Sequence, residues 1–166
     1  MRLILAALLA LACAACGQSP ETQTPEPQTT ATTTTDAPAA AAAAPTPEEV
    51  QALVASLPAP LNAADYENGR RVFAQCRSCH LVEAGAGNRV GPNLHDAFGN
   101  PSGHAPNFRY SPAMQSANLT WDFPTLDRYL EHPREVVPGT LMIFAGLRKP
   151  EDRRDVIAYI AAESKR

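Results

Sequence analysis

Residues 17–45 limit how much of this 166-residue chain can fold. The stretch contains four consecutive threonines at 32–35 and six alanines at 39–44, but no aromatic and no branched aliphatic residue. A segment with so little to bury cannot offset the entropy that ordering costs. We therefore expect a disordered, partly extended tether here, followed by a single domain with one core.

The segment before this tether is typical of an export signal. Arg2 precedes an apolar run from Leu3 to Ala12, which is shorter than the about 20 residues that span a bilayer. The following Ala-Ala-Cys-Gly at 14–17 resembles a bacterial lipobox, in which the cysteine is lipidated and becomes the new N-terminus. The sequence therefore predicts a signal peptide over 1–16 and lipidation of Cys16. The alternative is an ordinary signal cleaved near Ala15, which would release a soluble periplasmic protein.

The rest of the chain is expected to be all-α, with four or so helices and long loops. Thr46-Pro47-Glu48-Glu49 is a capping box that predicts a short helix and linker over 46–61, and Asn62 is expected to cap the helix that leads to Cys76. Further helices are predicted after Asp122 to about His132, and from about Pro150 onward. Residues 83–112 are rich in glycine, proline and asparagine. Such a long irregular stretch in a small domain suggests that it wraps a cofactor.

The sequence Cys76-Arg77-Ser78-Cys79-His80 allows several chemistries. A zinc site would need a second ligand pair, which the sequence lacks. A thiol redox pair would need a βαβ context, which is not visible. A disulfide fits the spacing, but it leaves His80 and the long loops unexplained. Covalent haem attachment needs these residues in this order, because two thiols bind the porphyrin edge and the adjacent imidazole binds iron.

A haem iron held by His80 would leave a sixth position for a second ligand. Met142 follows Pro138-Gly139-Thr140-Leu141, a turn sequence that can direct a side chain inward from a loop. The more common role of a methionine is to fill a core. The turn before Met142 favours it as the second ligand, and Met114 lacks such a context.

The charge of the region argues against nucleic-acid binding. Residues 62–166 hold thirteen basic and twelve acidic side chains, whereas nucleic-acid binding domains carry clustered positive charge.

From about Asp65 onward, the chain resembles class I c-type cytochromes of the mitochondrial-like and bacterial branch, here in a lipoprotein-anchored form. The matching motifs include Cys76–His80, Val90-Gly91-Pro92-Asn93-Leu94 and the stretch from Pro138 to Gly146. Further motifs lie at 69–73, 98–99, 105–110, 119–121, 129–130 and 155–160. The resemblance implies a cytochrome c fold over 62–166 around one covalent haem c.

The resemblance also assigns roles to individual residues. It implies thioether bonds at Cys76 and Cys79 and axial bonds from His80 and Met142. It further implies that the Pro92 carbonyl orients the His80 imidazole. The remaining roles are hydrogen bonds from Tyr110 and Trp121 to a haem propionate, a distal lining of Tyr129 and Thr140, and packing of Gly69 and Phe73 against Tyr159.

Two positions depart from the family pattern. Asn100 stands where relatives usually place an arginine beside the inner propionate, which should make that carboxyl harder to ionise. Met114 replaces an asparagine near the distal side, which suggests that this side is drier.

These features predict a one-electron carrier and not an enzyme. Its expected partners are a quinol-oxidising cytochrome bc-type complex as donor and a terminal oxidase or reductase as acceptor. We expect it to be monomeric and held on the periplasmic side of a membrane by its N-terminal lipid. An alternative function, a peroxidase or small-gas sensor, would require a labile Met142 bond.

Overall fold

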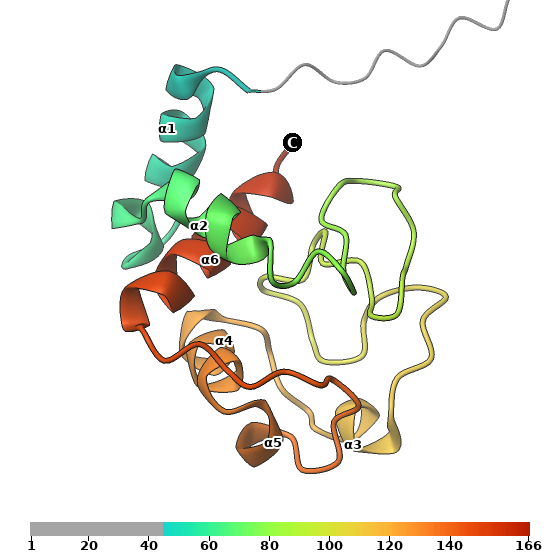
Figure 1. Cartoon of the computed structure of the whole chain (residues 1–166). Helices are drawn as coiled ribbons and strands as arrows, with labels where there is room; N and C mark the ends of the chain where they lie inside the picture. Colours follow the sequence, from blue (N-terminus) through green and yellow to red (C-terminus); the bar gives the residue numbers. More distant parts are fainter. Residues whose placement is uncertain (1–44) are drawn as a thin grey trace, which may run out of the picture. The chain divides into compact units, whose positions relative to one another are not determined.

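The computed structural model describes residues 45–166, and Figure 1 shows their arrangement. The predicted signal peptide, Cys16 and all but the last residue of the predicted tether lie outside the described residues. Within 45–166 the only β pairing is an isolated bridge between Pro101 and Thr120, so the all-α prediction is confirmed. The helices are α1 (Pro47–Ala55), the 3-10 turn η1 (Leu61–Ala63), α2 (Tyr66–Phe73), α3 (Pro112–Gln115), α4 (Phe123–Glu131), α5 (Pro133–Val136) and α6 (Pro150–Glu163).

Helix α1 begins at the predicted capping box. The Glu49 backbone N–H donates to Thr46 Oγ1 at 3.3 Å, and the Thr46 N–H donates to Glu49 Oε2 at 2.7 Å. Val54 is buried at the end of this helix, and the residues that follow it place Leu57 and Leu61 in the same core as α6. The segment predicted as a short helix and linker therefore packs against the domain that follows it.

The second helix starts later than predicted. Asn62 lies inside the 3-10 turn, and Asp65 is the residue whose side chain accepts the Asn68 N–H, at 2.9 Å. Both residues have the short polar side chain that suits a cap. Leu61 has no exposed surface. The 3-10 turn at 61–63 buries this side chain, and helix α2 therefore begins after Asp65, three residues beyond Asn62.

Helices α2 and α6 cross closely, and this contact organises the main core (Figure 1). Gly69 lies at the crossing, where an added Cβ would come within 2.1 Å of the Asp155 carbonyl oxygen. The ring of Tyr159 packs against Phe73 and Tyr66, with centroids 5.1 Å apart in both pairs. The predicted packing of Gly69 and Phe73 against Tyr159 is confirmed. A glycine is required here because the two backbones approach too closely for any side chain.

A second, smaller core lies under the later helices. Met114, Trp121, Tyr129 and Val137 are buried together, and Met142 packs against them. Helix α4, which carries Tyr129, begins at Asp122, whose carboxylate accepts the Thr125 N–H at 2.9 Å. Residues 80–111, between α2 and α3, contain no helix. The fold therefore joins two apolar clusters through long irregular segments, as the glycine- and proline-rich sequence predicted.

Candidate haem site

The cysteine pair lies just beyond the end of α2, in a run of tight turns. The Cys76 N–H donates to Phe73 O at 2.8 Å, and the His80 N–H donates to Cys76 O at 2.9 Å. Cys76 and Cys79 are free thiols and half-buried. Burial, reinforced by the neighbouring Cys79, raises the pKa of the Cys76 thiol to about 11. Cys76 packs against the main core just beyond the end of α2.

The imidazole of His80 is oriented through one of its two nitrogens. Nδ1 lies 2.7 Å from the Pro92 carbonyl oxygen, which can only accept, so Nδ1 carries the proton. Desolvation lowers the pKa of His80, and the hydrogen bond to Pro92 opposes this shift. The ring is therefore neutral at neutral pH, and its Nε2 lone pair is available to a metal.

Gly91 keeps the space beside this imidazole open. An added Cβ at Gly91 would lie 2.3 Å from His80 Cε1, so any side chain would displace the ring. The Gly91 N–H also donates to the Cys79 carbonyl at 2.8 Å. The Val90-Gly91-Pro92 segment therefore packs directly on the histidine that follows the cysteine pair.

Met142 lies in the irregular segment between α5 and α6. The Tyr129 hydroxyl lies 3.9 Å from Met142 Sδ and 3.1 Å from Thr140 Oγ1. Thr140 Oγ1 also accepts the Met142 backbone N–H at 3.3 Å. The structure therefore brings Tyr129, Thr140 and Met142 together, as the resemblance implied.

The two residues expected at a propionate lie near the second core. Trp121 is buried and packs against Tyr129, with ring centroids 4.9 Å apart. The Tyr110 hydroxyl accepts the Ala105 N–H at 3.2 Å, which leaves its own proton free to donate elsewhere, and burial raises the Tyr110 pKa.

The two residues that depart from the family pattern, Asn100 and Met114, have different surroundings. The Asn100 side chain donates to the Asp96 carbonyl at 2.6 Å, so it is used within its own loop. Met114 is buried in the second core, with 8% of its surface exposed.

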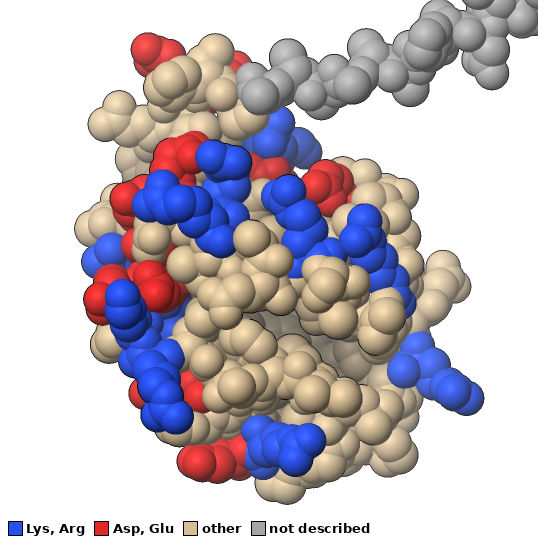
Figure 2. Space-filling view, in the orientation of Figure 1, with Lys and Arg blue, Asp and Glu red and all other residues tan. Residues whose placement is uncertain are grey.

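Cys76 and Met142 pack against two adjoining apolar clusters. One cluster includes Cys76, the other is packed by Met142, and Leu126 packs against both. Figure 2 shows a hollow in this face of the molecule, lined by residues that carry no charge, with lysine and arginine side chains around it. Three large apolar residues are highly exposed: Val90 (82%), which precedes Gly91, and Leu141 (76%) and Ile143 (91%), which flank Met142 in the sequence. The donor set is also suitable, with two thiols, a neutral imidazole and a thioether.

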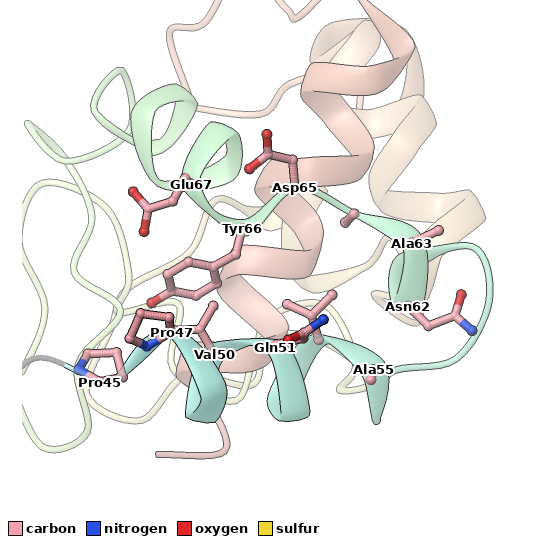
Figure 3. A pocket seen from close by; sticks show the side chains of 12 residues that line it. Pro45, Pro47, Val50, Gln51, Ala55, Asn62, Ala63, Asp65, Tyr66 and Glu67 are labelled. Atoms are coloured by element: carbon pink, nitrogen blue, oxygen red, sulfur yellow. The ribbon is translucent and has the colours of Figure 1, made fainter.

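A different groove lies between α1 and the start of α2 (Figure 3). It measures about 730 Å³ and is lined by Val50, Tyr66, Asp65 and Glu67, among others. It contains neither the cysteines nor His80. Its two carboxylates would repel the propionates of a haem, so this groove does not suit a porphyrin.

Comparisons with known proteins agree with this geometry. The family model described as "Cytochrome c" matches residues 66–163. The chain belongs to the cytochrome c family. It is 50% identical over 101 residues to the cytochrome c2 of Rhodomicrobium vannielii, covering 61% of this chain and 81% of the relative. It is 52% identical over 95 residues to the cytochrome c2 of Afifella marina, covering 55% and 77%.

A solved structure supports the same family. The chain matches cytochrome cH from Methylobacterium extorquens at 37% identity with a TM-score of 0.56, covering 58% of this chain and 97% of that one. Members of the family bind one covalent haem c through a Cys-x-x-Cys-His arrangement, here Cys76, Cys79 and His80. They are electron carriers and not enzymes. Among residues 45–166, no helix is long and apolar enough to cross a membrane.

Two contacts were not predicted from the sequence. The predicted short helix and linker at 46–61 precede the residues that match the family, and their leucines, Leu53, Leu57 and Leu61, enter or pack against the main core. Arg153 is 4% exposed, and its guanidinium binds Asp127 and two backbone carbonyls. Its sequence context, one of several charged residues at a helix start, gave no signal of burial.

Proposed function

We propose that this cytochrome carries one electron at a time on a haem held by His80 and Met142, with Cys76 and Cys79 bonded to the porphyrin. The observation that carries this proposal is the contact between His80 Nδ1 and the Pro92 carbonyl at 2.7 Å. It leaves Nε2 as the ligand nitrogen, one residue after two free thiols. When bound, the haem supplies a reversible one-electron couple, whose potential a thioether ligand raises.

The residues around the site have separate tasks in this proposal. Pro92 fixes the plane of the imidazole, and Tyr129 and Thr140 hold the Met142 side chain and backbone. Tyr110 and Trp121 donate hydrogen bonds to a propionate. Asn100 adds no positive charge beside that propionate, so we expect the carboxyl to ionise less readily than with an arginine there.

The proposed partners are a quinol-oxidising cytochrome bc-type complex as donor and a terminal oxidase or reductase as acceptor, on the periplasmic side of a membrane. The hollow face in Figure 2 is the proposed docking surface, because an electron must leave near the exposed edge of the haem. The hollow carries no charge and has positive side chains around it, so we expect docking to be weak and transient. We propose that the protein works as a monomer.

Replacing both Cys76 and Cys79 by serine tests covalent attachment. The wild-type protein should keep its haem through denaturation, because thioether bonds survive unfolding, and the double variant should lose it completely. A haem stain on a denaturing gel measures this directly. Retention of the stain in the double variant, or its absence from wild type, would contradict the proposal.

Electron transfer to the proposed acceptor has a separate test. When the reduced wild-type protein is mixed with membranes that contain the oxidase, its haem should become oxidised.

We further propose that residues 1–16 are a signal peptide, that Cys16 carries the lipid, and that 17–45 form the tether. The positions supporting this are the Ala-Ala-Cys-Gly sequence at 14–17 and the tether composition. A tether of about 30 residues has a root-mean-square reach of roughly 30 Å, which would keep the docking surface near its membrane partners.

Replacing Cys16 by alanine tests the lipid anchor. Wild-type protein should pellet with membranes and the Cys16→Ala variant should be released into the soluble periplasmic fraction, because the lipid is its only proposed anchor. Fractionation followed by haem staining measures both. A Cys13→Ala variant is the matched control and should remain with the membranes. Equal distribution of wild type and Cys16→Ala would support the ordinary secretory signal instead.

A further inference from the structure

The segment that carries Met142 has few backbone hydrogen bonds. Upstream, the Thr140 N–H donates to Val137 O at 3.0 Å, and downstream the Leu147 N–H donates to Leu130 O at 2.8 Å. Within the described part of the chain, no backbone-to-backbone hydrogen bond is made by residues 141–146. We call residues 141–146 the ligand span. With little internal support, its position depends on how its two ends are held.

Helix α4 holds the upstream end of the ligand span. The Tyr129 hydroxyl contacts Thr140 Oγ1, and Thr140 Oγ1 in turn accepts the Met142 N–H. Tyr129 is 6% exposed and lies in the second core, so this contact is fixed to a well-packed side chain.

Arg153 holds the downstream end. Its Nη1 donates to the carbonyl oxygens of Leu147 at 2.9 Å and Arg148 at 3.1 Å. Its Nε donates to Asp127 Oδ1 at 2.7 Å, and Nη1 lies 3.4 Å from Glu131 Oε1. Asp127 and Glu131 both belong to α4, so one guanidinium ties the end of the ligand span to the helix that holds its beginning.

The backbone at this end is also tightly packed. Gly146 has φ +91°, and a Cβ added there would lie 2.1 Å from the Glu131 carbonyl oxygen. The chain therefore passes directly against α4 before Leu147. Because Arg153 is nearly buried and its hydrogen bonds are charge-assisted, losing the guanidinium would leave Asp127 and two carbonyls without their partner.

We propose that Arg153 is a positioning residue for Met142: by fixing the downstream end of the ligand span to α4, it keeps the thioether at the sixth position of the iron. This inference rests on the proposed role of Met142 as a ligand. It adds that the strength of Met142 ligation is set in part by a side chain on α6, eleven positions later in the sequence.

The test compares Arg153→Gln with Arg154→Gln in the holoprotein. Arg154 is the neighbouring arginine on α6, and the hydrogen bonds that its side chain makes in the described residues go to Asp155, the shortest at 2.6 Å. Three quantities are measured: the rate of carbon monoxide binding to the reduced protein, the Met–iron charge-transfer band of the oxidised protein, and amide hydrogen exchange at Leu147. Denaturant unfolding of each variant reports global stability separately.

For Arg153→Gln we expect carbon monoxide binding and Leu147 exchange to be about tenfold faster or more, because losing a charge-assisted hydrogen bond changes a local equilibrium by at least that factor. The charge-transfer band should weaken. Arg154→Gln should leave all three readouts unchanged even if it unfolds more easily. Arg153→Lys keeps the positive charge but cannot bind Asp127 and the two backbone carbonyls at the same time. Its three readouts should therefore lie between those of Arg153→Gln and wild type.

Unchanged carbon monoxide binding and Leu147 exchange in Arg153→Gln would overturn the proposal, as would equal changes in Arg154→Gln. If Arg153→Gln fails to yield folded holoprotein, Asp127→Asn carries the same test, because it weakens the link to α4 while leaving Arg153 in place. A wild-type protein that lacks the charge-transfer band would instead refute Met142 as a ligand. That result concerns the proposed function and is distinguishable from failure of the Arg153 variants alone.

Discussion

Replacing Met142 by leucine should lower the reduction potential and open the iron to external ligands. Leucine has a similar volume but no sulfur, so the site loses its thioether while the second core loses little packing. Axial ligands tune haem potentials over about 0.8 V, and we expect a drop on the order of 0.1 V or more. Potentiometric titration measures this drop, and carbon monoxide should bind the reduced variant much faster than wild type.

The chain provides a matched control for this substitution. Met114 is buried in the cluster against which Met142 packs, so Met114→Leu makes the same chemical change at a methionine that is not the proposed ligand. It should keep the wild-type potential and slow carbon monoxide binding. If Met114→Leu and Met142→Leu shift the potential equally, or if neither does, Met142 is not the ligand. Fast carbon monoxide binding to wild type would favour a peroxidase or gas sensor.

Replacing Gly69 by alanine should have the largest effect on stability. The added Cβ would lie 2.1 Å from the Asp155 oxygen, 2.7 Å from the Asp155 carbonyl carbon and 2.8 Å from Tyr159 Cβ. Two of these atoms are backbone, so the helices must separate. Overpacking of this kind costs about 1–3 kcal/mol and sometimes more. Because two of the clashing atoms are backbone, we expect the upper end of this range; alanine regains about 1 kcal/mol of helix propensity, so the net loss in the free energy of unfolding should be about 2 kcal/mol.

Denaturant unfolding followed by far-UV circular dichroism measures this loss, and haem absorbance shows whether the site is released in the same transition. The control is Arg71→Ala, which places the same methyl side chain on the exposed side of α2. It leaves the crossing of α2 and α6 intact, so we expect a change within about 0.5 kcal/mol. A Gly69→Ala variant as stable as wild type would show that the crossing can relax.

Local chemistry explains what could be predicted from the sequence. The capping box at Thr46, the helix after Asp122 and the helix from Pro150 each carry their own start signal within a few residues. The cysteine pair with His80 is also a contiguous motif. Such features need no knowledge of distant contacts, and the structure has all of them where they were expected.

Long-range packing explains what could not be predicted. Asn62 and Asp65 are equally good caps in isolation, and the burial of Leu61 decides between them. Helices α3 and α5 have only four residues each, too few for a period to be visible. The buried guanidinium of Arg153 binds Asp127 and the Leu147 carbonyl. Because these partners lie outside helix α6, no local sequence pattern predicts the contact.

The packing of α1 would have a mechanical consequence if the proposed lipid at Cys16 holds the domain by its N-terminus. Any tension applied through residues before Pro45 reaches α1 first. Val54, Leu57 and Leu61 are buried in the same core as α6. Their packing contacts would therefore bear part of the force, and less of it would reach α2 along the backbone. The turns at Cys76 and His80 come next in the chain after α2, and this packing would shield them from a pull on the proposed anchor.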